Sequence, residues 1–262
     1  MNIRSRRDKI IQLLSEQGSV EVKDLASRLA TSLVTVRSDL SSLEKEGKLQ
    51  RFFGGAKLPD TTHTLKDKNQ KFDFELDVSQ RYKINDTAKT RIARKAAEMV
   101  PSNATVIIDS GSTTHLLARE LAKKGNLTVI TNNLAAASSL VCVNSITLAL
   151  SGGIYRSVSQ SIHGQKAEQF FDGIYADIAF IGADGLDPER GITTFNEGYN
   201  VTQVMAQCAK LIFILADSSK LSRSGFNEVL APEQLQTIIT DSEIPQSVID
   251  RFEEKGISVI VV

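Results

Sequence analysis

The stretch "ATSLVTVRSDLSSLEKEGKLQRFFGGA", from Ala30 to Ala56, holds two different structural signals. The apolar residues of its first part fall at i, i+3, i+7 and i+10, which predicts a helix with one buried stripe. Its last part predicts a short basic hairpin with its bend at the Gly54-Gly55 pair. The residues of the predicted stripe are Leu33, Val36, Leu40 and Leu43.

Two more helices are predicted upstream of this stretch. Helical spacing begins near Arg6 and ends before Gly18, and a second, short pattern covers roughly 22–30. The hydroxyl of Ser32 is placed to cap the helix that follows. A short helix, a brief turn and a capped second helix form a helix-turn-helix, whose second helix enters the major groove of DNA.

Side chains outside the buried stripe are the candidates for DNA contact. Val34 beside Thr35 can meet a thymine methyl group, and Arg37 can bind guanine or phosphate. "GKLQRFFGGAKL" predicts a two-stranded wing with basic side chains along the DNA backbone. A three-helix packing or oligomerisation module is the alternative interpretation. The predicted DNA-binding residues are Ser32, Val34, Thr35, Arg37, Ser38, Arg51 and Lys57.

The composition favours a folded, soluble, cytoplasmic protein. Apolar residues make up 41% of the 262 residues, and no apolar run approaches the roughly 20 residues of a membrane span. The N-terminus lacks the apolar stretch of a signal peptide. With only Cys142 and Cys208, and three scattered His, neither a disulfide framework nor a metal site is expected. No cofactor is predicted.

The charge is divided unevenly along the chain. Residues 1–58 hold 11 Lys and Arg against 7 Asp and Glu, and the remainder holds 20 against 24. A basic head on an acidic body suggests a local contact with a polyanion. The polar residues 59–80 start with Pro and are predicted to be a linker. Helical spacing returns over 81–100, and the body is predicted to occupy 81–262.

After Pro101 the chain alternates buried strands with helices. The strand-like runs are "ATVIID", "LTVIT", "ITLAL", "ADIAFIGADG", "KLIFILADSSK", "LQTIITD" and "ISVIVV". Near-continuous apolar strands separated by helices predict an α/β domain with a mainly parallel sheet covered by helices. Ligands of such sheets bind beyond the carboxyl ends of the strands.

The loops at these strand ends predict an anion site. In "DSGSTTH", Asp109 to His115, a strand ends, Gly111 permits a tight turn, and hydroxyls surround the start of a helix, which suits a phosphate. Lys220 is a cation that could meet the same phosphate. The predicted effector-binding residues are Asp109, Ser110, Gly111, Ser112, Thr113, Thr114, Asn132, Gly152, Gly153, Gly182, Asp184, Glu197 and Lys220.

Residues 4–57 resemble the N-terminal domain of DeoR-type bacterial transcriptional regulators. The resemblance rests on "TVRSDL", "LEKEGKL" and "RFFGGA", which occur in the family's order. The family often has Arg where this chain has Ser38, and many members have His where it has Phe53. The resemblance implies a winged helix-turn-helix domain that binds double-stranded operator DNA.

The body resembles the sugar-phosphate sensing domain of the same family, which is related to ribose-5-phosphate isomerase. The motifs "DSGSTT", "TNN", "SGG", "GADG", "GITT" and "DSSK" occur in family order. The isomerases carry an acidic D-G-A-D-E cluster, but here Ile181 and Gly185 stand in place of the acids that flank Gly182-Ala183-Asp184. Because a proton relay needs a positioned acid and base, the resemblance implies a sensor rather than an enzyme.

The leading hypothesis is a repressor of a carbohydrate catabolic operon that a phosphorylated sugar releases from its operator. We expect a homo-oligomer, at least a dimer, because one helix reads only a few base pairs. One alternative is a sugar-phosphate isomerase with an accessory DNA-binding head. Another is a DNA-architectural protein, which would leave the polar strand ends of the body unexplained.

Overall fold

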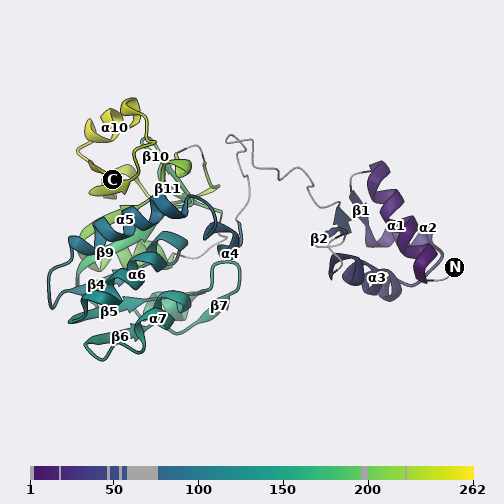
Figure 1. Ribbon diagram of the computed structural model, residues 1–262, viewed down its shortest axis with the longest axis horizontal. Coiled ribbons are helices and arrows are strands. Elements are labelled where there is room, and N and C mark those ends of the chain that lie inside the picture. The colour runs from purple at the N-terminus through teal and green to yellow at the C-terminus, as the bar shows by residue number, and fades with distance from the viewer. Residues whose placement is uncertain are drawn as a thin grey trace. The chain divides into compact units, whose positions relative to one another are not determined.

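The computed structural model describes residues 3–17, 19–45, 48–52, 55–57, 76–195, 200–221 and 223–262. The chain divides into two compact units, one within residues 1–70 and the other within residues 71–262 (Figure 1). The first carries a helix-turn-helix and the second a parallel sheet flanked by helices. The predicted fold class is therefore confirmed.

The described part of the head consists of three helices and a small antiparallel sheet in which β3 lies between β1 and β2. The hairpin of β2 and β3 is the predicted wing. The sequence did not predict β1, because its three residues carry no periodic pattern. The elements are α1 (Ile3–Gln17), β1 (Ser19–Glu21), α2 (Val22–Arg28), α3 (Leu33–Lys45), β2 (Gln50–Phe52) and β3 (Gly55–Lys57).

The head has its own hydrophobic core, to which α3 contributes Val36, Leu40 and Leu43, each at most 2% exposed. The prediction that Leu33 completes this buried stripe is wrong, because its side chain is 40% exposed. Helical side chains lean toward the N-terminus of their helix. The side chain of this first residue of α3 therefore projects past the packed part of the helix.

The body is built on a seven-stranded sheet with the order β15-β14-β12-β9-β4-β5-β6. All neighbouring strands are parallel, as the buried apolar runs predicted. The strands are β4 (Thr105–Ile108), β5 (Leu127–Thr131), β6 (Ile146–Leu150), β9 (Ala176–Gly182), β12 (Ala209–Leu215), β14 (Thr237–Thr240) and β15 (Ser258–Val261).

Helices cover both faces of this sheet, and alternate strand residues contribute to each side. Val106 and Ile108 pack in the core beneath α5 (Asp86–Glu98), α6 (Ser112–Lys124) and α7 (Leu134–Leu140), which lie on the near side in Figure 1. Ile107 belongs to the core of the opposite face. That face is covered by α8 (Gln165–Gln169), α9 (Val201–Gln207) and α10 (Gln246–Glu253).

Short antiparallel elements join the main strands. They were not predicted, because three- and four-residue strands leave little periodicity to detect. Two of them, β7 (Ile154–Arg156) and β8 (Ser161–His163), form a hairpin. The others are β10 (Gly185–Asp187), β11 (Gly191–Thr194) and β13 (Asn227–Leu230), with the 3-10 turns η1 (Ser218–Lys220) and η2 (Pro232–Gln234).

The body begins earlier than the predicted linker of residues 59–80 allows. Leu76 and Val78 are buried, and α4 (Val78–Arg81) is part of the C-terminal unit. The single helix predicted over 81–100 is also wrong, since α4 and α5 are separate. Asn85, with a φ of 52°, precedes α5 in the left-handed conformation that interrupts a right-handed helix.

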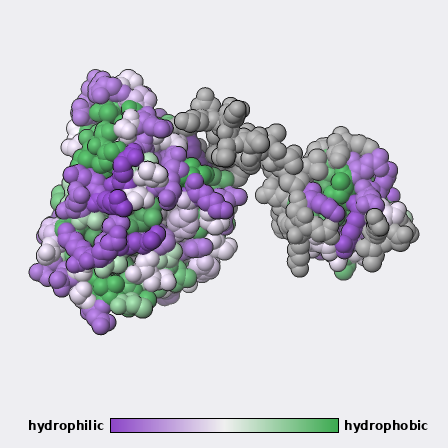
Figure 2. Space-filling model, in the orientation of Figure 1, coloured by the Kyte–Doolittle hydropathy of each residue, from purple (hydrophilic) through white to green (hydrophobic). Residues whose placement is uncertain are grey.

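The surface of the body is mixed. On the face seen in Figure 2, hydrophilic residues dominate and apolar residues gather in smaller areas among them. Large apolar side chains that are more than half exposed include Val141 after α7 and both Ile154 and Tyr155 on β7. Among the described residues, no helix has the length and apolar character needed to cross a membrane.

Candidate effector site and DNA-binding surface

The strand order creates a switch point between β4 and β9. From β4 the chain builds the sheet outward through β5 and β6, and then returns to place β9 on the other side of β4. The carboxyl ends of these two strands lead to Asp109 and Gly182, and a pocket lies there. This is where open parallel sheets bind their ligands.

The turn after β4 forms one wall of the pocket. Gly111 has a φ of 152°, which other residues rarely adopt, and a Cβ there would lie 3.3 Å from Thr114 Oγ1. That hydroxyl donates to the carbonyl of Gly111, and α6 begins at Ser112. The first-turn amides of a helix have no partners within the helix itself. They make an electropositive end that suits a phosphate group.

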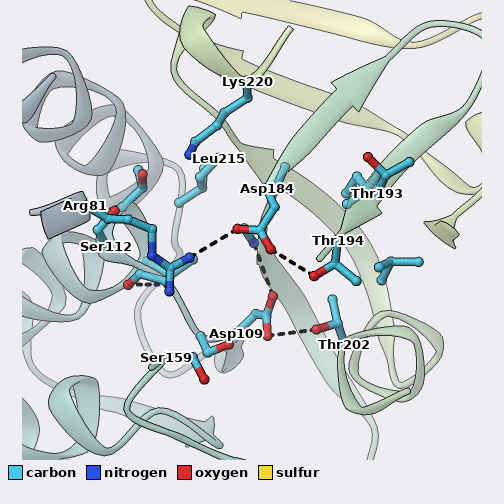
Figure 3. A pocket seen from close by; sticks show the side chains of 18 of the residues that line it. Arg81, Asp109, Ser112, Ser159, Asp184, Thr193, Thr194, Thr202, Leu215 and Lys220 are labelled. Carbon is cyan, nitrogen blue, oxygen red and sulfur yellow. Dashed lines mark hydrogen bonds and ion pairs between the residues drawn. The ribbon is translucent and has the colours of Figure 1, made fainter. Parts of the chain in front are cut away.

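Two carboxylates lie at the centre of the pocket (Figure 3). Asp109 is 3% exposed and accepts hydrogen bonds from Thr202 Oγ1 at 3.1 Å and from the Gly182 amide at 3.3 Å. Burial raises the pKa of Asp109 to about 6, against the lowering effect of these hydrogen bonds. Asp184 accepts from Arg81 Nη1 at 3.1 Å and from Thr194 Oγ1 at 2.8 Å.

Two cations line the pocket with these carboxylates, and a third is buried nearby. Arg81 comes from α4 and Lys220 from η1, and both line the pocket. Burial lowers the pKa of Lys220, while the nearby Asp217 and Asp184 oppose that effect. Lys89 of α5 lies behind them, only 1% exposed, and its Nζ is 4.0 Å from a carboxylate oxygen of Asp217. Burial lowers the pKa of Lys89 to about 8.

The β7–β8 hairpin supplies a further wall through Arg156, Ser159 and His163. The hydroxyl of Ser161 is 2.7 Å from both Ser159 Oγ and His163 Nε2. Burial lowers the pKa of His163 to about 4, and the charge of Arg156 acts in the same direction. His163 is therefore neutral at physiological pH and offers hydrogen bonds without a charge. Burial of this many polar groups with displaced pKa values is typical of functional sites.

Nine of the thirteen predicted effector-site residues line this pocket. They are Asp109, Ser110, Gly111, Ser112, Thr113, Thr114, Gly182, Asp184 and Lys220.

Three of the other four lie elsewhere, and Glu197 falls outside the described residues. Asn132 is buried and donates from Nδ2 to the carbonyl of Ile162, which holds β8 beside the end of β5. Gly152 and Gly153 line a separate depression next to α8. A Cβ on Gly153 would lie 2.6 Å from the carbonyl of His163, so the absence of a side chain there permits close packing against β8.

Several pocket residues were missed by sequence reasoning. Arg81 directly follows the segment that was predicted to be a linker, and Arg156 belongs to the hairpin that was not predicted. Thr202 comes from α9, far along the chain. The only available signal was chemical type, since polar residues at the ends of apolar runs can turn toward a site. Nothing in their spacing places them at this pocket.

In the head, α3 presents the predicted DNA-contacting side chains to solvent. The Ser32 hydroxyl accepts from the Thr35 amide at 3.1 Å, so the predicted helix cap is present. Val34 is 74% exposed, and Arg37 and Ser38 are exposed beside it. An exposed valine has no packing role, which leaves it available for a base contact.

Two observations complete the description of this surface. Asp39 is 3% exposed and accepts from Arg6 and Arg7 of α1, which fixes α3 against α1. Arg51 and Lys57 lie on β2 and β3 as predicted for the wing, but their side chains are outside the described part of the structure.

In both units, the described residues contain no cluster of His, Cys, Asp and Glu suited to a metal ion.

The similar proteins agree with this two-part organisation. Residues 6–62 match the model of the DeoR-like helix-turn-helix domain, and residues 84–242 match the model of the DeoR C-terminal sensor domain. A ribose 5-phosphate isomerase A structure from Methanocaldococcus jannaschii is 22% identical, with a TM-score of 0.40, over 52% of this chain and 55% of that chain. A likeness at this distance says nothing about activity.

Relatives match over nearly their whole length. A candidate aga operon transcriptional repressor of Escherichia coli O157:H7 is 35% identical over 98% of this chain and 93% of its own. The transcriptional regulator GolR of Listeria innocua is 32% identical over 97% and 96%. The glycerol-3-phosphate regulon repressor of Escherichia coli K12 is 28% identical over 93% and 92%. This chain belongs to the DeoR family of DNA-binding transcriptional regulators.

Proposed function

We propose that this protein represses a carbohydrate catabolic operon and that a phosphorylated sugar releases it from operator DNA. The observation that carries the proposal is the position of the Ser110–Thr114 turn. This anion-type turn opens a helix at the switch point of the sheet, in a pocket that also contains Arg81 and Lys220. The names of relatives as repressors of the aga operon and of the glycerol-3-phosphate regulon support a carbohydrate operon.

The chemistry of the pocket matches the two ends of a sugar phosphate. Backbone amides and hydroxyls of the turn, with the α6 dipole behind them, favour the phosphate dianion. Lys220 adds a buried cation beside it. Asp184 can accept hydrogen bonds from sugar hydroxyls, and neutral His163 can exchange hydrogen bonds with others. A neutral sugar would leave the turn and the cations without a partner, so affinity should depend on the phosphate.

We further propose that the protein does not turn the sugar over. Isomerisation requires that the protein place a base and an acid beside two neighbouring carbons of the sugar. Asp109 and Asp184 each accept hydrogen bonds from two neighbouring groups, and no acid flanks Asp184. A Cβ at Gly185 would lie 2.4 Å from the carbonyl of Arg223, so an acidic side chain does not fit there. Conversion of ribose 5-phosphate to ribulose 5-phosphate by the purified protein would contradict this proposal.

The protein should bind DNA as a dimer or larger homo-oligomer. One recognition helix contacts only a few base pairs, and paired half-sites about one helical turn apart are the usual way to reach specificity. The apolar side chains exposed at the end of α7 and on β7 are candidates for contacts between the bodies of two subunits. They include Val141, Ile154 and Tyr155.

The experiment that tests the function is selection of genomic DNA fragments by the full-length protein. The bound fragments are then challenged with a panel of phosphorylated sugars and with the same sugars lacking phosphate. We expect enrichment of fragments upstream of carbohydrate genes and their release by at least one phosphorylated sugar. Enrichment of unrelated sequences, or release by neutral sugars alone, would contradict the proposal.

A further inference from the structure

The pocket at the switch point is almost filled by the protein's own side chains. It encloses about 70 Å³, whereas sites for small organic ligands typically enclose about 300–1,000 Å³. Arg81 and Asp184 meet across it, with side chains only 10% and 13% exposed. Figure 3 shows them approaching from opposite sides, with Lys220 above. With this ion pair in place, the free space is therefore smaller than that of a typical small-ligand site.

The ion pair also ties a short helix to the pocket, because Arg81 is the last residue of α4. The Val78 amide at the start of α4 donates to the carbonyl of Val158, next to the pocket residue Ser159. The carbonyl of Arg81 accepts from Lys89 Nζ at 2.6 Å.

The residue after α4 is also attached to the pocket. The Tyr82 hydroxyl is 2.8 Å from Nδ1 of His115, which directly follows the Ser110–Thr114 turn. The β7–β8 hairpin, Asp184 and the start of α6 thus each hold α4 or its adjoining residue.

The hydrogen bonds within α4 contribute little to its stability. Four residues are too few for a helix to be stable alone, so α4 depends on these tertiary contacts. Elements of this kind open at lower free energy than the core of a domain. The neighbouring α5 has thirteen residues, and its apolar face packs directly against the core. A change at Arg81 should therefore move α4 and leave α5 unmoved.

We propose that the Arg81–Asp184 ion pair closes the effector site, and that a phosphorylated sugar enters by separating these two side chains and so releases α4. The inference rests on the proposed effector site and names the element that responds to its occupation. Phosphate competes with Asp184 for the guanidinium of Arg81, and sugar hydroxyls replace Arg81 on Asp184. Because α4 is the first described element of the body, its release changes the N-terminal end of the C-terminal unit.

Amide hydrogen exchange on the full-length protein, measured on peptides covering 76–84 and 110–118, tests this inference. Inorganic phosphate serves as the probe, because its binding requires no knowledge of the sugar. In the parent protein, phosphate should slow exchange at the start of α6. It should also accelerate exchange of the Val78 and Tyr82 amides by about tenfold.

The variant Arg81→Gln should show rapid exchange at Val78 and Tyr82 without phosphate, and phosphate should add no further acceleration there. Because Arg81→Gln leaves Asp184 buried without this cation and can unfold the unit, the double variant Arg81→Gln/Asp184→Asn supplies a neutral pair with the same expected result. Arg94→Gln is the matched control, since it removes an exposed arginine from α5. It should leave the exchange of α4 as in the parent.

The outcomes separate this inference from the proposed function. If phosphate protects the start of α6 in the parent while α4 exchanges as before, the anion site stands and the inference is overturned. If phosphate changes neither peptide, the proposed anion site fails, and the variants without phosphate decide the inference. Unchanged exchange of α4 in both the single and the double variant would then refute the inference, and rapid exchange would support the role of the ion pair in holding α4.

Discussion

Replacing Asp109 with Asn should make the C-terminal unit more stable at neutral pH. Burial raises the pKa of Asp109 from 3.8 to about 6 in the folded protein. At about 1.4 kcal/mol per pH unit, the ionised carboxylate destabilises the folded state by about 3 kcal/mol above pH 6. An amide has no such cost. It is nearly the same size and can still bond to Thr202 and to the Gly182 amide.

The expected gain is smaller than the full figure, because Asn has one acceptor oxygen where the carboxylate has two. We expect Asp109→Asn to raise the free energy of unfolding by about 1–3 kcal/mol at pH 7. The sign of the pH dependence follows from the raised pKa. The stability of the parent is lost as pH rises from about 4 to about 6, so the advantage of the variant grows over that window. It disappears below pH 4, where Asp109 is protonated in both states.

Urea unfolding followed by tyrosine fluorescence measures this effect in the full-length protein. The sequence has no Trp, and its four Tyr all follow residue 81, so the signal reports the C-terminal unit alone. Asp177→Asn is the control, because hydrogen bonds from the Thr105 amide and Lys210 lower the pKa of Asp177. That variant should be no more stable than the parent at pH 7. A loss of stability in Asp109→Asn at pH 7, or a gain that does not change between pH 4 and 6, would refute the reasoning.

Four predictions concern the DNA-binding head and the assembly of the protein. Arg37→Ala should weaken binding to the selected operator by about 1–3 kcal/mol and relax base preference, which binding to a library of mutated sites would measure. Lys57→Ala should instead weaken all DNA alike and reduce the salt slope of binding by about one, measured by repeating the titration at several salt concentrations. Ser32→Ala should lower the free energy of unfolding of the head by about 1 kcal/mol, because the helix cap is lost. Circular dichroism during unfolding, measured on a head fragment and on the full chain, would show this change. Sedimentation at micromolar concentration should give at least a dimer, and a monomer that still binds the operator tightly would contradict the expected paired half-sites.

Long periodic segments predicted most of the fold. The seven sheet strands are recognisable as apolar runs, because burial on both faces of the sheet makes their apolar residues nearly continuous. The order of the strands in the sheet was not predicted, because it depends on which strand lies beside β4. No local pattern records that β9 returns to the centre of the sheet.

The candidate site was predictable only where function and local structure share the same residues. The Ser110–Thr114 turn combines a glycine that the backbone requires with hydroxyls at a helix start, so its sequence shows both roles. Arg81 shows neither, because its place in the pocket follows from the way α4 packs against the body. Leu33 illustrates the reverse error, since a helical period identifies a face but not where the neighbouring elements end.

The central claim is that a sugar phosphate bound at the Ser110–Thr114 turn lowers affinity for the operator. The most direct measurement titrates the protein–operator complex with the phosphorylated sugar found by selection, for the parent and for Thr113→Ala. In the parent, saturating ligand should weaken operator binding by roughly 5–150-fold, and operator should weaken ligand binding by the same factor. Thr113→Ala should bind the operator as the parent does but need far more sugar phosphate for release. Release of both proteins at the same ligand concentration would place the effector elsewhere and contradict the account.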